Sequence, residues 1–259
     1  GRITEIYGPF SSGKSTIVAT ILASFQQKGG HAVVADGEHS YSPQWVTTFG
    51  IDPATLFVMQ PPCLQDMFEQ VAFLCQQLVI SHSSTPVVIA VDSLSSFPTR
   101  EEIEFLDDSK KKSGQTDPSR ALGLHARYCA KGMRILSDLI WKSKVAIIFV
   151  SQLKENPMKM YQKAKLGGSA VDFHAVLQLH TSKLEKDDSS LTINLRCEKN
   201  KVAFPFRETS FNVVFGEGID DSDTFIKVAL EKGLLTQQQG GWYTVTKTGV
   251  RGRASDVVG

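Results

Sequence analysis

Three absences limit what this 259-residue sequence can encode. It contains no apolar run of membrane length and no recognisable signal peptide, so we expect no membrane partner. The formal net charge is +1, so any surface that binds nucleic acid must be a local cluster of cations. The cysteines have no paired spacing, which argues against a disulfide framework or a zinc site and favours reduced thiols in a cytoplasmic compartment. They are Cys63, Cys75, Cys129 and Cys197.

The clearest motif lies at residues 8–15, which read GPFSSGKS. This stretch matches the phosphate-loop pattern of glycine, four residues, glycine, lysine and then serine or threonine. A strand-like segment, 3–7, precedes it and a helical apolar segment, 16–22, follows it. In such a loop, backbone N–H groups and the helix N-terminus bind phosphates, the lysine reaches the β- and γ-phosphates, and Ser15 ligates Mg²⁺. We expect the nucleotide to contact Gly8, Pro9, Ser11, Ser12, Gly13, Lys14, Ser15 and Thr16.

Apolar strand-like runs alternate with helical patterns along much of the chain. The alternation predicts an α/β fold with a mostly parallel twisted sheet, helices on both faces and an antiparallel extension formed by the later strands. We place the core at 1–217 and expect 218–259 to begin a small, partial α+β subdomain. The sequence starts without Met, so we expect an excerpt of a longer chain. The predicted strands are 31–36, 55–60, 86–91, 144–150, 175–180, 191–197 and 210–215, and the predicted helices are 14–28, 41–49, 64–82, 119–143 and 221–232.

Three polar residues follow buried strands that are expected to end at the same edge of the sheet. Asp92 is suited to hold Mg²⁺ together with Ser15, although a carboxylate in this position also caps helices. Glu38 is a candidate general base that would orient water against the γ-phosphate, and the alternative is a solvated loop carboxylate. Gln152 can donate a hydrogen bond to a γ-phosphate, or it can simply begin a loop.

Cations cluster locally despite the balanced total charge. Arg127, Lys131 and Arg134 recur at intervals that place them on one face of the predicted helix 119–143. Such a stripe is often solvated surface, but the lysine-rich loop 107–118 that precedes it favours contact with a nucleic-acid backbone. A second long, lysine-containing loop is expected at 154–168, and long loops in compact domains are often functional.

These motifs together resemble the RecA family of ATP-dependent recombinases. The resemblance extends over nearly the whole chain in the order of the family. It is carried by GRITEIYGP at 1–9, DGEH at 36–39, VDS at 91–93, GLHAR at 123–127, GGSA at 167–170, KNKVAFPF at 199–206 and FGEGI at 215–219.

The resemblance implies roles for individual residues. Glu38 would be the catalytic glutamate, Gln152 the nucleotide sensor, and Trp45 the aromatic residue that stacks on adenine. Lys199 and Lys201 would reach the γ-phosphate of ATP on a neighbouring subunit and act there with Lys14 and Glu38. The loops 107–118 and 154–168 would bind DNA. The expected DNA contacts are Arg127, Lys131, Arg134, Lys154, Gly167, Gly168 and Ser169.

The implied function is ATP-dependent DNA strand exchange in recombination and repair. The expected cofactors are ATP and Mg²⁺, and the expected partners are single-stranded DNA, homologous duplex DNA and further copies of the chain in a helical filament. The bacterial phosphate loops carry an acid where this chain has Phe10, and Ser151 replaces an Asn, which favours a divergent member in bacterial or phage-infected cytoplasm. The alternatives are a ring-forming helicase motor of the same fold and a nucleotide-binding regulator without turnover.

Overall fold

The computed structural model describes residues 1–106, 123–155, 163–165, 170–254 and 256. The chain divides into two compact units, which are described separately here. The first unit comprises Gly1–Ser182 and Leu195–Glu208, and the second comprises Lys183–Asn194 and Thr209–Gly259. The predicted domain boundary after residue 217 stays a prediction. Within the described ranges, no helix combines the length and apolarity that crossing a membrane requires.

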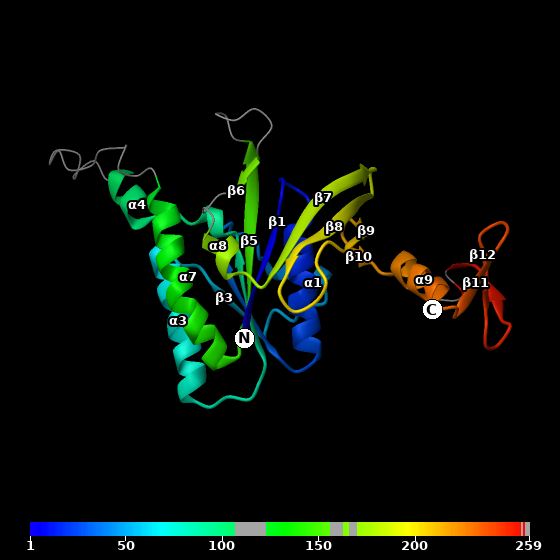
Figure 1. Ribbon diagram of the computed structural model, residues 1–259, viewed down its shortest axis with the longest axis horizontal. Helices are drawn as coiled ribbons and strands as arrows, with labels where there is room; N and C mark the ends of the chain where they lie inside the picture. The colour runs from blue at the N-terminus through cyan, green and yellow to red at the C-terminus, as the bar shows by residue number, and fades with distance from the viewer. Residues whose placement is uncertain (107–122, 156–162, 166–169, 255, 257–259) are drawn as a thin grey trace. The chain divides into compact units, whose positions relative to one another are not determined.

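A parallel sheet forms the centre of the first unit and has the strand order β7-β1-β5-β4-β2-β3 (Figure 1). All five neighbouring pairs in this order run parallel, as predicted, and in the register Ile3 lies opposite Ile147, which lies opposite Ile89. The carboxyl ends of these strands therefore meet at one edge, where polar side chains that follow them are brought together. The strands are β1 (Arg2–Gly8), β2 (His31–Asp36), β3 (Leu56–Met59), β4 (Val87–Asp92), β5 (Ala146–Glu155) and β7 (Leu177–Lys186).

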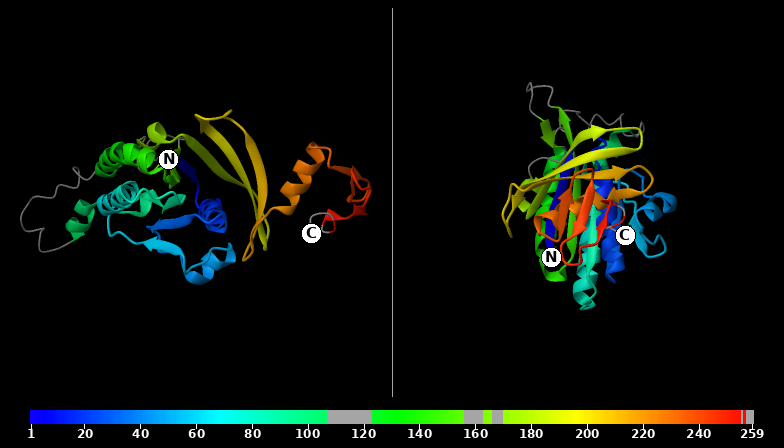
Figure 2. Two further views of the ribbon diagram at one scale, coloured as in Figure 1. Left: turned by 90° about the horizontal axis from the view of Figure 1, so that it is seen from below. Right: turned by 90° about the vertical axis from the view of Figure 1, so that its right-hand side faces the viewer.

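Helices cover both faces of this sheet, which confirms the predicted α/β class. Helices α3 and α7 lie side by side on one face, and α1 packs on β1, β2, β4 and β5 through its own buried side chains (Figures 1 and 2). The central strands are apolar on both faces because both are covered; β4 is buried along its whole length. The helices of this unit are α1 (Lys14–Gln27), α2 (Pro43–Thr48), α3 (Leu64–Ile80), the 3₁₀ turn η1 (Leu94–Ser96), α4 (Arg100–Leu106), α7 (Leu124–Ser143) and α8 (Ala170–His174).

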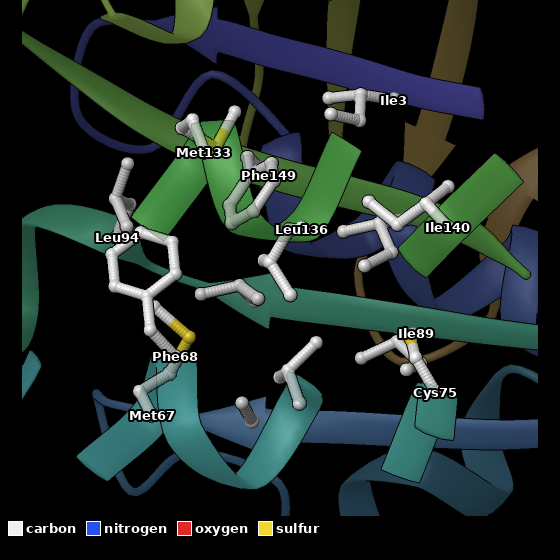
Figure 3. Close-up of a cluster of buried hydrophobic side chains, with 14 of the residues drawn as sticks. Ile3, Met67, Phe68, Cys75, Ile89, Leu94, Met133, Leu136, Ile140 and Phe149 are labelled. Atoms are coloured by element: carbon white, nitrogen blue, oxygen red, sulfur yellow. The ribbon is translucent and has the colours of Figure 1, made fainter. Parts of the chain in front are cut away.

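The main apolar core lies between α3, α7 and the sheet. Figure 3 shows side chains from these two helices meeting residues of β1, β4, β5 and η1. Met133, Leu136 and Ile140 are spaced along one face of α7, and all three are buried. Burying such a side chain contributes about 1.5–3 kcal/mol relative to leaving it exposed, so this core holds α7 rigidly against the sheet. The outer face of α7 is thereby presented to solvent.

The second unit contains the outer ends of β7 and β8 (Ser190–Asn200), with β9 (Glu208–Val214) and β10 (Gly218–Asp220) beside them. Strands β9 and β10 are antiparallel, as predicted for this end of the sheet. The unit also holds α9 (Ser222–Glu231) and a separate antiparallel sheet. The strands of that sheet are β11 (Leu235–Gln238), β12 (Trp242–Val245) and β13 (Arg251–Gly252).

The two predicted DNA loops have different outcomes. The loop 107–118 lies outside the described residues. Within 154–168, the first two residues continue β5, and β6 (Lys163–Lys165) pairs antiparallel with the end of that strand. The expectation of a continuous loop is therefore wrong for these residues, because backbone pairing with β6 extends β5 beyond its predicted end at 150.

Candidate functional site

The phosphate loop connects β1 to α1 and is fixed by its own hydrogen bonds. Ser12 Oγ donates to the Pro9 carbonyl oxygen at 2.8 Å, and Ser12 Oγ lies 2.7 Å from Thr181 Oγ1. A Cβ on Gly8 would lie 2.3 Å from Thr181 Oγ1, and Gly13 has a positive φ of 76°. The two glycines are thus required by close packing and by backbone conformation, which gives the spacing of the motif a physical cause.

Lys14 points back into this loop. Its ammonium donates to the Pro9 carbonyl oxygen at 2.7 Å, and the residue is only 7% exposed. A buried ammonium needs anionic or strongly polar partners because desolvation disfavours its charge. Phosphate oxygens bound in the loop would supply further negative charge to this ammonium.

Asp92 lies at the end of β4, where the sequence placed a metal-binding carboxylate. Burial raises its pKa to about 6, while hydrogen bonding with Ser15 lowers it and the nearby charge of Glu38 raises it. Tyr41 donates to Asp92 Oδ2 at 3.0 Å. No group of three or more His, Cys, Asp or Glu side chains in the described ranges could form a metal site by itself. Ser15 and Asp92 nevertheless fit a Mg²⁺ that is bound mainly by phosphates and water, because a buried carboxylate is stabilised by a nearby cation.

Glu38 and Gln152 come from different strands and contact each other directly. Gln152 Nε2 donates to Glu38 Oε1 at 2.6 Å, and the same oxygen accepts hydrogen bonds from Ser93 Oγ at 2.8 Å and Ser96 Oγ at 3.2 Å. The carboxylate is thus held in one orientation by an amide and two hydroxyl groups. The arrangement leaves a fixed acceptor beside the phosphate loop, which is the geometry that a general base for water requires.

The turn that carries Glu38 is fixed by the acid before it. Asp36 Oδ1 accepts hydrogen bonds from the backbone N–H groups of Glu38 and Ser40, each at 3.2 Å, and its Oδ2 accepts one from the Tyr41 N–H at 3.1 Å. Asp36 itself is 1% exposed. Because one buried carboxylate organises three backbone donors, the turn holds Glu38 in place without help from the nucleotide.

Trp45 lies on α2 in an aromatic group. Its ring centre is 5.2 Å from that of Tyr41 and 4.7 Å from that of Phe49. Its side chain is partly exposed, which leaves surface for a flat ligand, while Tyr41 connects the group to Asp92. Stacking of adenine on Trp45 stays a prediction.

Lys199 and Lys201 lie at the end of β8, away from the phosphate loop of their own chain. The N–H of Lys201 donates to the carbonyl oxygen of Val176, whose N–H donates to the carbonyl oxygen of Ile3, near the start of β1. Because strands rise about 3.3 Å per residue, this level of β1 is roughly 17 Å from Gly8 at its other end. A lysine side chain does not span that distance.

Three cations surround His174 in α8. Burial lowers the pKa of His174, and the charges of Lys201, Arg134 and Lys199 lower it further. His174 Nδ1 lies 2.7 Å from Ser137 Oγ of α7, and the Lys199 ammonium donates to the carbonyl oxygen of Asp172. The structure thus brings the two lysines and one of the α7 arginines into the same neighbourhood.

The structure describes four of the seven residues that are predicted to contact DNA. Arg127, Lys131 and Arg134 are all exposed on α7, as the helical spacing predicted. The backbone of Lys154 lies in β5, opposite Ala164 of β6. The other three, Gly167, Gly168 and Ser169, lie outside the described residues.

Several residues of the site, including three that make direct contacts, were not identified from the sequence. Thr181 supports the phosphate loop from β7, Tyr41 hydrogen-bonds Asp92, and Ser93 hydrogen-bonds Glu38. The hydroxyl-rich segment 93–96 after Asp92 was a usable signal for Ser93, because hydroxyl groups beside a metal-site strand end commonly orient carboxylates. Thr181 has no such local signal, since its role depends on the neighbouring strand.

Comparison with known proteins gives the same family that the motifs resemble. Residues 1–220 match the RecA N-terminal domain family. The chain is 32% identical over 251 residues to Protein RecA of Saccharopolyspora erythraea, covering 94% of this chain and 68% of that protein. It is 34% identical to Protein RecA of Clostridium acetobutylicum, over 94% of this chain and 67% of that protein, and 34% identical to Protein RecA of Clostridium novyi, over 96% and 68%. The chain therefore belongs to the RecA family of ATP-binding recombinases that act in DNA recombination and repair.

Proposed function

We propose that this chain hydrolyses ATP in response to DNA, as part of a helical filament that exchanges DNA strands. The observation that carries the proposal is the Glu38 carboxylate, held by Gln152 at 2.6 Å and by Ser93 at 2.8 Å beside a complete phosphate loop. A nucleotide-binding regulator without turnover has no need for a carboxylate positioned in this way. The proposal therefore includes catalysis as well as binding.

Binding of ATP would depend on Lys14 and the backbone of the phosphate loop. The ammonium now donates to the Pro9 carbonyl oxygen, and phosphate oxygens would take over part of this interaction. Ser15 and Asp92 would hold Mg²⁺, which neutralises charge on the β- and γ-phosphates when bound. Trp45 would stack on the adenine ring.

Glu38 would orient the attacking water and accept its proton. Its Oε1 already accepts three hydrogen bonds, so the side chain has little freedom to rotate away from the water. A γ-phosphate would compete with Glu38 for the amide N–H of Gln152. Movement of Gln152 would pass along β5 toward the predicted DNA loop at 154–168, which couples nucleotide state to DNA affinity.

Lys199 and Lys201 would act on ATP bound to the next subunit. Their position near the start of β1, roughly 17 Å from their own phosphate loop, supports action between chains and argues against action within one chain. A cation supplied by a neighbour stabilises charge that develops on the transferred phosphoryl group. Hydrolysis would then belong to the interface between two subunits.

Single-stranded DNA and an incoming homologous duplex are the proposed nucleic-acid partners. The exposed cations of α7, together with the loops 107–118 and 154–168, would contact phosphates, and base pairing would supply sequence recognition. Local clusters of cations that contact phosphates would allow a chain of net charge +1 to bind DNA.

The experiment that tests the proposal is an ATPase assay with and without single-stranded DNA over a range of protein concentrations. We expect turnover to require DNA and to rise with protein concentration, and we expect electron microscopy to show helical filaments. ATP binding without turnover under all conditions would favour a regulator, and closed rings would favour a helicase motor.

A further inference from the structure

Two exposed phenylalanines lie on separate loops of the first unit. Phe10 is at the crest of the phosphate loop and is 57% exposed. Its position is fixed because the preceding carbonyl, that of Pro9, accepts hydrogen bonds from both Ser12 and Lys14. A large apolar side chain held outward on a rigid loop is an unusual choice beside a site for a charged ligand.

The second phenylalanine is carried by a loop that is closed by its own hydrogen bonds. Asn200 Oδ1 accepts from the N–H groups of Val202 and Ala203, each at 2.9 Å. The base of the loop is closed by backbone hydrogen bonds between Cys197 and the pair 206–207, at 2.7 and 2.8 Å. Phe204 projects from it and is 77% exposed, with the guanidinium carbon of Arg207 5.9 Å from its ring centre.

The two phenylalanines cannot meet within one chain. The loop that carries Phe204 begins at Lys201, at the level of Ile3, whereas Phe10 follows Gly8 at the other end of β1. Complementary patches at opposite ends of one molecule are the arrangement that a head-to-tail assembly uses, because each copy offers one patch to the copy before it and the other to the copy after it.

We propose that Phe10 of one copy of this chain packs against Phe204 of the next copy, forming an apolar contact beside the shared ATP. The inference rests on the proposed function, because it uses the action of Lys199 and Lys201 on a neighbouring subunit. If Lys201 reaches a γ-phosphate on the neighbour's phosphate loop, Phe204 is brought near that loop, because three residues place it at most about 10 Å from Lys201. A second copy of the chain is therefore the occupant of both surfaces.

A pair of charge substitutions tests this contact in the whole chain. Phe10→Glu introduces the type of residue that bacterial phosphate loops carry at this position, so nucleotide binding tolerates it, and Phe204→Lys places a cation on the opposing loop. In sedimentation with ATP, we expect each single variant to raise the protein concentration needed for assembly by about 10-fold or more, and the double variant to recover to within about 3-fold of the parent, because every interface then pairs Glu with Lys. Phe225→Lys, a control on α9 with 51% exposure in the parent, should assemble normally.

The outcomes separate this contact from the shared active site. Normal assembly of both single variants, or a double variant no better than either single one, would overturn the aromatic contact alone. Single variants that assemble normally but lose affinity for single-stranded DNA would also overturn it and would assign the rings to DNA bases. The shared site has its own test in Lys199→Ala/Lys201→Ala, for which normal turnover in assembled protein would refute the proposed function while leaving the phenylalanine result intact.

Discussion

The phosphate-loop end of the first unit and the surface around His174 differ in how much of their chemistry a single chain supplies. At the phosphate loop, Lys14, Asp92 and Glu38 each have partners within the chain, at distances from 2.6 to 3.2 Å. Around His174, burial and then the charges of Lys201, Arg134 and Lys199 lower the pKa of the imidazole. The first region holds its groups through contacts within one chain, whereas the second contains the lysines that the proposed function assigns to ATP on a neighbouring subunit.

The two regions therefore require different kinds of experiment. A site that is complete within one chain can be tested by single substitutions in dilute protein. A site completed by another molecule must be tested by varying concentration, DNA or the mixture of variants.

Lys14→Ala should abolish ATP hydrolysis, the largest effect that we expect. The substitution removes the main cation that balances the phosphate charges inside a shielded loop. We therefore expect no detectable turnover. Steady-state ATPase measurements with circular dichroism as a check on folding would test this. The control is Lys28→Ala, at the other end of α1, which should keep full activity. Turnover in Lys14→Ala equal to that of the parent would contradict the assignment of the phosphate loop.

Asp92 should make the nucleotide-free protein less stable as pH rises from about 4 to 6. Burial raises the pKa of this carboxyl to about 6 in the folded state, so the folded chain keeps a proton that the unfolded chain has already lost. Asp92→Asn should remove this contribution and raise the free energy of unfolding at pH 7.5 by up to about 3 kcal/mol.

Urea denaturation at pH 4.5 and 7.5 would measure the effect of Asp92. The matched control is Asp188→Asn, which changes an exposed carboxylate and should alter neither value. If the free energy of unfolding of Asp92→Asn differs from that of the parent by the same amount at both pH values, the carboxyl is not a buried proton-binding group.

Trp45 should report nucleotide binding with a smaller energetic effect. Stacking of an aromatic side chain on a base contributes about 1–3 kcal/mol, so Trp45→Leu should weaken ATP binding by about 5- to 150-fold and remove the change in tryptophan emission. Trp141→Phe, on α7 with 68% exposure of Trp141, should leave both unchanged. An emission change that persists in Trp45→Leu would place adenine elsewhere.

A further prediction concerns the exposed cations of α7, of which Arg134 lies near His174. Replacing Arg127 and Arg134 by Ala should flatten the dependence of log affinity for single-stranded DNA on log salt by about 0.7 per lost contact. Lys142→Ala is the control, because its ammonium is already paired with Asp138 at 2.6 Å on the same helix. A slope in the double variant equal to that of the control would move the DNA site away from this face of α7.

The sequence predicted the fold and part of the site because those signals are local. The positive φ of Gly13 is a requirement that acts within a few residues, and Glu38, Asp92 and Gln152 each follow a strand whose apolar run is visible. The contacts of Thr181 and Tyr41 were missed because they join residues far apart in the chain, and only the strand order brings them together. The extension of β5 to Glu155 was missed because it depends on pairing with β6, which has no hydrophobic pattern of its own.

The central claim is that ATP hydrolysis is shared between two copies of the chain, and mixing two inactive variants tests it most directly. Lys199→Ala/Lys201→Ala keeps Lys14 and Glu38, and Glu38→Gln keeps both distant lysines. Each variant alone should bind ATP and hydrolyse it poorly, because the general base contributes about 10²–10⁴-fold to the rate and the cation supplied by a neighbour about 10³–10⁵-fold. An equal mixture on single-stranded DNA should regain part of the parent turnover, since one kind of interface combines an intact glutamate with intact lysines. No recovery on mixing, in samples where filaments containing both variants are seen, would contradict a shared site.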